Sequence, residues 1–262
     1  MLWRRVLSAL IGIPLVIFII YLGGSWLATA TFFLIFIGSY EFKQMLTRKG
    51  FTLVFLPVLI GEILLIAGIL RGWSFWFPFS FGVCFVLILF LTVLNFPKYK
   101  IEELSLSLLI FLYVGWSLAH ILLLRINYGY LTVIYLFIII WSSDTGAYFT
   151  GSYLGKNKLS PLVSPNKTIE GAVGGIVFSL FIGYLYNLTF PVFTYPFLFV
   201  VTLLVTITGQ IGDLVESSFK RMAGVKDSGN IIPGHGGILD RFDSIIISAP
   251  MLFYLLILFR YQ

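Results

Sequence analysis

Charged and polar side chains gather in one segment of an otherwise apolar chain, between Ser217 and Asp243. The segment reads SSFKRMAGVKDSGNIIPGHGGILDRFD and combines carboxylates, cations, a histidine and a glycine-rich turn. Apolar runs flank it on both sides, and charge beside a bilayer is costly, so it usually marks a functional site. Carboxylates beside cations suit a metal-assisted reaction of a phosphorylated, anionic substrate.

A polar helix face leads into this segment. Gln210, Asp213, Ser217 and Lys220 recur at helical spacing, so they are expected to share one face. An acid at this depth needs a cation. Asp213 therefore either forms an internal ion pair with a lysine or arginine, or holds a metal ion.

Two further acids begin the last apolar run. Asp240 and Asp243 are three residues apart, which places them on one helix face, where acids also suit the helix dipole and can act simply as caps. The preceding helix is antiparallel and joined by one loop, so Asp213 and Asp240 are expected to converge. Carboxylates with waters and substrate phosphates are the usual ligands of Mg²⁺. Asp213 and Asp240 are therefore predicted metal ligands, with Asp243 as a third.

The loop between these acids carries cations and a histidine. Lys220, Arg221, Lys226 and Arg241 can hold a triphosphate or a lipid phosphate, or they can reflect membrane topology and headgroup contact. His235 can bind a phosphate or relay a proton, or it can be a structural hydrogen-bonding residue. The glycines around it allow positive φ and close approach of the backbone to a ligand.

A second motif lies upstream. Ser164 and Pro165 are typical of a helix N-cap and first helical residue, which puts Lys167 in the first turn, against the helix dipole. An anion bound at this helix start would resolve the conflict. Alternatively, Glu170 neutralises Lys167 locally. Asp144 closes an apolar run and is expected to orient a ligand or to hold Lys167.

Together these motifs resemble the signature of the phosphatidate cytidylyltransferase family, the CDP-diacylglycerol synthases. The elements S-x-F-K-R, K-D-x-G and P-x-H-G-G-x-x-D-R-x-D all occur between Ser217 and Asp243. The resemblance implies that CTP and phosphatidate give CDP-diacylglycerol and pyrophosphate, with one or two Mg²⁺ ions as cofactor. The specificity for cytosine comes from this resemblance alone.

The residues assigned to catalysis are Asp213, Asp240, Lys220, Arg221, His235 and Asp144. The residues assigned to substrate binding are Lys167, Asn166, Ser217, Lys226, Asp227, Gly236, Gly237 and Arg241.

Other functions stay open at this point. One is a related CTP-using membrane enzyme, such as a polyprenol or phytol kinase or a cytidylyltransferase for another lipid phosphate. Another is an ion-coupled transporter, with Asp144, Asp213 and Asp240 along the ion path. Transporters often contain inverted repeats, and no internal repeat is evident here. The D-G-x-x-A-R motif of the CDP-alcohol phosphatidyltransferases does not occur in the sequence.

The composition predicts the architecture. Of the 262 residues 59% are hydrophobic, which is too many for a soluble domain, and the single cysteine, Cys84, excludes an intrachain disulfide and a thiolate metal cluster. The net charge of +6 indicates membrane topology and anionic lipid rather than nucleic acid. We expect an all-α polytopic membrane protein with about nine spans. The expected spans are 6–22, 25–42, 53–70, 75–94, 104–124, 129–150, 168–188, 193–214 and 242–260.

The basic residues predict the orientation. With the N-terminus in the cytoplasm, only Arg71, Arg125 and Arg260 fall on the far side, and both motif-bearing connections face the cytoplasm. The chain is then one transmembrane domain, 1–262, in which 1–128 is generic and 129–262 carries the motifs. We expect a multi-pass protein of the inner (plasma) membrane of the cell, with the active site facing the cytoplasm. A homodimer stays open.

Overall fold

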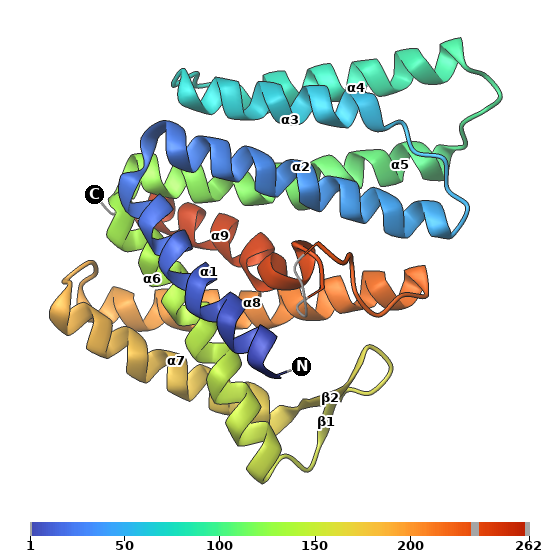
Figure 1. Ribbon diagram of the computed structural model, residues 1–262. Helices are drawn as coiled ribbons and strands as arrows, with labels where there is room; N and C mark the ends of the chain where they lie inside the picture. Colours follow the sequence, from blue (N-terminus) through green and yellow to red (C-terminus); the bar gives the residue numbers. More distant parts are fainter. Residues whose placement is uncertain (1, 232–235, 260–262) are drawn as a thin grey trace. The chain divides into compact units, whose positions relative to one another are not determined.

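The computed structural model describes residues 2–231 and 236–259, and helices make up most of them (Figure 1). The elements are α1 (Leu2–Leu22), α2 (Gly24–Arg48), α3 (Phe55–Leu70), α4 (Trp76–Leu94), α5 (Ile101–Ile110), the π-helix η1 (Phe111–Trp116), α6 (Ser117–Leu154), β1 (Lys158–Ser160), β2 (Ser164–Thr168), α7 (Ile169–Thr189), α8 (Tyr195–Ala223) and α9 (Leu239–Leu258). The chain forms two compact units. Unit 1 comprises Met1–Leu123 and Met222–Arg241, and unit 2 comprises Leu124–Arg221 and Phe242–Gln262.

The prediction of an all-α membrane protein is confirmed. Within the described part of the chain, six helices are long and apolar enough to cross a bilayer, and two shorter apolar helices lie at Gly12–Leu22 and Phe55–Leu70. Each of the nine expected spans coincides with a helical segment. The number of crossings and their direction stay predictions.

Two of the expected spans, 104–124 and 129–150, lie in one continuous helical stretch of 54 residues, Ile101–Leu154. A straight helix of this length would measure about 80 Å, far more than the roughly 30 Å of a bilayer core. The backbone leaves helical geometry at Gly129, where φ is 83°, a value that favours glycine. Gly129 therefore marks the expected boundary between the two spans.

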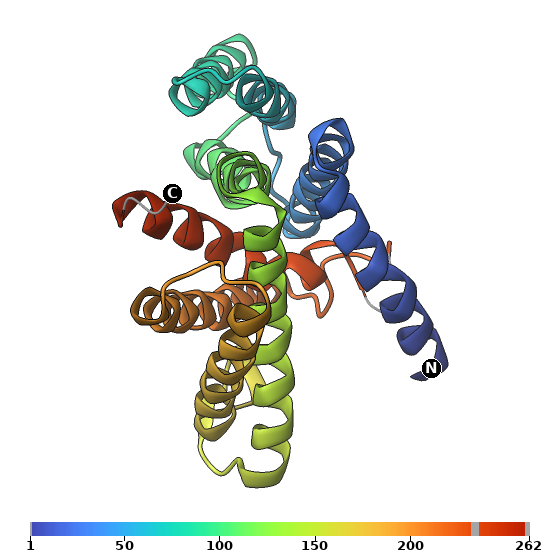
Figure 2. The ribbon, with the colours of Figure 1, turned by 90° about the vertical axis from the view of Figure 1, so that its left-hand side faces the viewer.

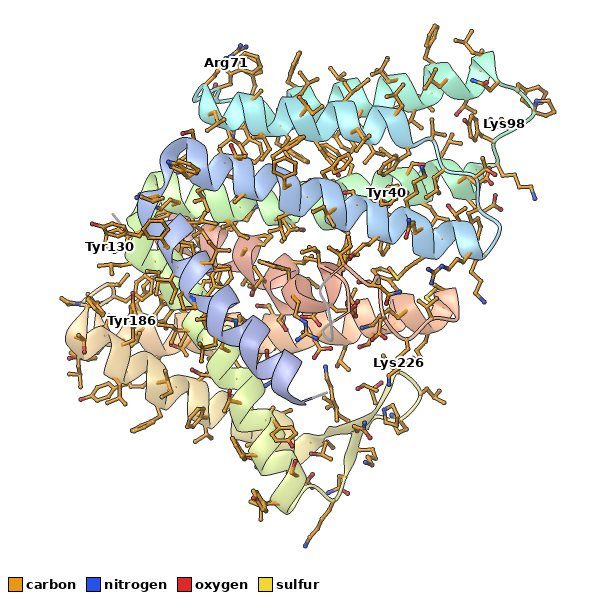
Figure 3. All side chains as sticks on the ribbon, viewed as in Figure 1. Tyr40, Arg71, Lys98, Tyr130, Tyr186 and Lys226 are labelled. Atoms are coloured by element: carbon orange, nitrogen blue, oxygen red, sulfur yellow. The ribbon has the colours of Figure 1, made fainter. Side chains whose placement is uncertain are left out.

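Unit 1 contains the α3–α4 pair, whose helices run side by side (Figures 1 and 2). Gly61 of α3 permits this packing, because a Cβ there would lie 2.8 Å from the Cβ of Cys84 and 2.9 Å from the ring of Phe111. Cys84 is thus a packing residue. Arg71 and Lys98 lie at opposite ends of the α3–α4 pair (Figure 3), as the expected topology requires of them.

Unit 2 contains the second part of α6, which lies alongside α7 (Figure 2). Small residues form this contact, since a Cβ on Gly146 would lie 2.6 Å from Phe178, and a Cβ on Gly174 would overlap Thr150. Close approach of helix backbones through small residues is the usual packing of membrane helices.

We expect Gly174→Ala to destabilise the protein by about 1–3 kcal/mol, because the added methyl group must push α7 away from Thr150. Thermal unfolding in detergent measures the effect. Gly82→Ala in α4 is the control: a Cβ there has nothing within 4 Å, so the change should be neutral or stabilising by up to about 1 kcal/mol. Equal unfolding temperatures for the two variants would contradict this account of the α6–α7 contact.

A β-hairpin connects α6 to α7. β1 and β2 are antiparallel, with Lys158 opposite Thr168 and Ser160 opposite Ser164. The prediction that Ser164 caps a helix was therefore wrong: α7 begins at Ile169, and its cap is Thr168, whose Oγ1 accepts a hydrogen bond from the Gly171 amide at 3.1 Å. Pairing with β1 keeps this segment extended in spite of its helix-start pattern.

Candidate functional site

A cavity of 510 Å³ in unit 2 is lined by Asp144, by residues of the upstream motif at 164–167 and by residues of α8. Four predicted site residues line it, namely Asp144, Asn166, Lys167 and Asp213. The complete lining is Asp144, Ala147, Tyr148, Gly151, Ser152, Leu159, Asn166, Lys167, Thr168, Gly171, Ala172, Gln210 and Asp213. Its walls therefore come from α6, the hairpin, the start of α7 and α8.

An ion pair joins Lys167 of β2 to Asp213 of α8. The internal ion pair considered for Asp213 is thus confirmed. Both side chains are 28% exposed, and both line the cavity, so the pair is accessible to a ligand. The Ser217 hydroxyl donates to the other oxygen of Asp213, Oδ1, at 3.4 Å.

Glu170 does not neutralise Lys167, contrary to one of the alternatives considered. Its carboxylate accepts hydrogen bonds from the Lys156 amide at 3.1 Å and from the Asn157 side chain at 2.8 Å. Glu170 thereby fixes the chain between α6 and β1. The expected position of Lys167 in a first helical turn was also wrong, since it lies on β2.

Gln210 holds the helices together beside the cavity. Its Nε2 donates to the Ser143 hydroxyl in α6 at 3.3 Å and to the Ala172 carbonyl in α7 at 3.0 Å. The amide thus connects three helices one turn before Asp213. Its predicted place on the polar face of α8 is confirmed, and its contacts are those of a structural residue.

α8 and α9 approach closely next to Asp213. A Cβ on Gly212 would lie 2.6 Å from the Asp243 carbonyl oxygen, so only glycine allows the contact. Asp213, Glu216 and Asp144 all act electrostatically on Asp243. Two of these three acids already have a cationic partner, since Asp213 pairs with Lys167 and Glu216 pairs with Lys220.

The donor set suits a hard cation such as Mg²⁺. Of the residues that the structure describes, no three His, Cys, Asp or Glu side chains lie together as a ready-made metal site. Mg²⁺ does not need one, because it usually binds through one or two carboxylates and completes its shell with water and substrate phosphate. The Asp213 carboxylate, which lines the cavity, therefore fits the ion.

α8 extends to Ala223, so the lysine and arginine expected in a loop lie on its last turns. Lys220 Nζ pairs with Glu216 at 2.6 Å, and Arg221 Nε donates to the Val163 carbonyl at 3.2 Å. Arg221 thus anchors the hairpin loop to α8. A contact of either cation with a phosphate stays a prediction.

In unit 1, Asp240 holds the segment that precedes α9. Its Oδ2 accepts hydrogen bonds from the Ser228 amide at 2.9 Å, the Ser228 hydroxyl at 2.9 Å and the Gly237 amide at 2.8 Å. Gly236 has the positive φ expected of this turn, 81°. Asp240 therefore organises the loop as well as being a predicted metal ligand.

The remaining predicted residues of this segment fall into two groups. Lys226, Asp227 and Arg241 are exposed, and Figure 3 labels Lys226. His235 lies outside the described residues.

The structure adds one acid that the sequence interpretation missed, Glu41 of α2, whose carboxylate binds the same segment. Its signal in the sequence was an acid within an apolar run.

Comparisons with known proteins match nearly the whole chain. A model of the cytidylyltransferase family matches residues 3–259. The chain is 38% identical to a phosphatidate cytidylyltransferase of Bacillus subtilis over 274 aligned positions, covering 98% of each chain. It is 37% identical to the enzyme of the same name from Staphylococcus haemolyticus and 36% identical to that of Staphylococcus saprophyticus, in each case over 261 positions, 97% of this chain and 98% of the relative.

Proposed function

The chain belongs to the cytidylyltransferase family, and from this premise we propose that it transfers the cytidylyl group of CTP to phosphatidate. The products are CDP-diacylglycerol and pyrophosphate. Besides the family membership, one structural observation carries the proposal: the Lys167–Asp213 pair opens onto a cavity that Asp144 and Asn166 also line. A cation, an amide and two acids at one cavity suit a phosphate-bearing substrate with its metal ion.

The reaction is a displacement at phosphorus. An oxygen of the phosphatidate phosphate attacks the α-phosphorus of CTP and forms a new P–O bond. The bond from the α-phosphorus to the bridging oxygen breaks, and pyrophosphate leaves with the electron pair. The nucleophile is already an anion, so no strong base is needed, and the main barrier is the repulsion between two anionic substrates.

Lys167 and Asn166 lower this barrier. The Lys167 ammonium moves from Asp213 to a phosphate oxygen of CTP, and the Asn166 amide donates a second hydrogen bond. Both residues lie on β2, which the hairpin and the Thr168 cap of α7 hold in place. Gln210 keeps α8 in register with α6 and α7, so that Asp213 stays at the cavity.

Magnesium is the proposed cofactor. Asp213 would hold it, while Asp240 stays the second predicted ligand and Asp243 the third. When bound, Mg²⁺ neutralises phosphate charge and so favours the approach of the second anion. Asp144, on the same cavity, orients the substrate or its water shell.

The proposed topology has nine spans, with the N-terminus and the active site in the cytoplasm, where CTP is available. Support comes from the distribution of basic residues and from the placement of Arg71 and Lys98 at opposite ends of the α3–α4 pair (Figure 3). Because the relatives are bacterial, the proposed location is the inner (plasma) membrane.

A product assay tests the proposed function. Purified protein in lipid nanodiscs, supplied with CTP, Mg²⁺ and phosphatidate, should release one pyrophosphate for each CDP-diacylglycerol formed. Replacing phosphatidate with polyprenol, phytol or another lipid phosphate tests the related enzymes. Formation of a phosphorylated alcohol and CDP would point to a kinase, and ion flux without CTP turnover would point to a transporter. Either result would refute the proposal.

A further inference from the structure

Glu41 is a buried acid of α2, only 1% exposed, in the half of the chain that carries no recognised motif. Its Oε1 accepts a hydrogen bond from the Ile238 amide at 3.0 Å. Its Oε2 accepts from the Leu239 amide at 3.0 Å and from the Ser228 hydroxyl at 3.0 Å. One carboxylate thus binds the segment at Ser228 and again at the first residue of α9, and it caps that helix from another helix.

Glu41 and Asp240 share the Ser228 hydroxyl. The hydroxyl lies 3.0 Å from Glu41 Oε2 and 2.9 Å from Asp240 Oδ2, and its single hydrogen can serve one of them at a time. The backbone amide of Ser228 also donates to Asp240. Ser228 therefore links the two carboxylates, so a displacement of Glu41 is transmitted to Asp240.

Two glycines leave room for Glu41. A Cβ on Gly229 would lie 2.5 Å from Glu41 Oε1, and a Cβ on Gly237 would lie 2.6 Å from the Glu41 carboxyl carbon. Gly229, the last residue of the K-D-x-G element, and Gly237, the last residue of the H-G-G element, thus face this carboxylate. A side chain at either position would push it out of place.

We infer that Glu41 is a positioning residue for the proposed cytidylyl transfer, acting on Asp240 through Ser228 and the start of α9. This inference rests on the proposed function for its catalytic consequence. Its structural part, the anchoring of Ser228, Ile238 and Leu239 by Glu41, can be measured without any turnover. A failure of the anchoring is therefore distinguishable from a failure of the proposed function.

Hydrogen exchange with mass spectrometry tests the anchoring in nanodiscs. In Glu41→Ala, the amides of Ile238 and Leu239 lose their acceptor, so peptides covering 236–239 should exchange about tenfold faster or more. Glu41→Gln keeps the size and one acceptor oxygen but turns an N–H toward a donor, so its increase should be smaller. Glu41→Gln also tests the anchoring if the alanine variant does not fold. Unchanged exchange in both variants would overturn the inference.

The matched control is Glu62→Gln. Glu62 is an acid of α3 that is equally buried, 2% exposed, and accepts a hydrogen bond from Ser39 at 2.5 Å. Loss of this acid should leave the exchange of 236–239 and the kcat unchanged. Faster exchange throughout unit 1 in both Glu41 and Glu62 variants would show a general loss of stability, and the positioning role would be refuted.

Kinetics test the catalytic part. Glu41→Ala should lower kcat about tenfold, with the KM for CTP changed less than about threefold, because Asp240 is displaced while the proposed contacts of CTP with Lys167 and Asn166 remain. Glu41→Gln should recover part of the loss. A rise in KM without a fall in kcat would contradict a role that acts through Asp240.

A double-mutant cycle tests the contact with Gly229, where all three nearest atoms to an added Cβ belong to Glu41. Gly229→Ala should lower kcat in the wild-type background, where the new methyl group overlaps Glu41. The same change should cost several-fold less in the Glu41→Ala background, because the overlapping side chain is then absent. Fully additive effects would show that Glu41 and Gly229 act separately.

Discussion

Replacing Asp213 with Asn is expected to lower kcat on the order of 10³-fold, the largest effect expected of any single substitution in the cavity. A neutral amide is a poor ligand for Mg²⁺, and it leaves Lys167 without the carboxylate that now positions it. The Mg²⁺ concentration for half-maximal activity should also rise about tenfold or more. Steady-state rates measured across a Mg²⁺ titration check both numbers, and metal chelation should stop the wild-type reaction.

A charge swap separates this role from that of a structural ion pair. Lys167→Asp combined with Asp213→Lys restores an attraction between β2 and α8. If the pair only stabilises the fold, the double variant should regain activity. We expect it to regain thermal stability but to stay as inactive as Asp213→Asn, because the cation and the acid have exchanged places. Recovery of activity would refute the functional role of the pair.

Replacing Lys167 with Met is expected to lower kcat/KM by about 10²–10³-fold. Methionine keeps the length of the side chain but removes the charge that would meet the phosphates of CTP. Lys167→Arg should retain part of the activity, since it keeps the charge with a different geometry. Initial rates at varied CTP concentration check this expectation.

The control for this prediction lies on the same hairpin. Lys158 of β1 stands opposite Thr168, is exposed and is not among the residues that line the cavity. Lys158→Met should therefore keep kcat/KM within about twofold of wild type. Equal losses in the Lys158 and Lys167 variants would indicate that only the net charge of the hairpin matters.

Much of the cavity could be predicted from the sequence. Asp144 and Asp213 stood out because an acid in an apolar run is costly and needs a cation. An internal partner for Asp213 followed from the same reasoning, and the structure identifies it as Lys167. The helical segments were also predictable, because apolar runs of bilayer length have few alternatives to a helix.

The start of α7 could not be predicted from local signals. Ser164 and Pro165 are typical of a helix start, and local propensity favours one there. The strand forms instead because β1 pairs with it and because Glu170 binds the Lys156 and Asn157 amides. These are tertiary contacts, and no local sequence pattern indicates them.

The role of Glu41 was hidden for another reason. Its contacts reach across 187 residues to Ser228 and 198 residues to Leu239, so no pattern of spacing connects them. The first half of the chain was interpreted as generic, although an acid between Tyr40 and Phe42 was itself a signal. Its partners became evident only from the folded chain.

A structure of the purified protein with Mg²⁺ and a non-hydrolysable CTP analogue tests the central claim most directly. We expect the phosphates within hydrogen-bonding distance of Lys167 Nζ, the metal ion bound to Asp213, and the present ion pair between these two residues broken or lengthened. A nucleotide bound elsewhere, with the Lys167–Asp213 pair unchanged, would contradict the account.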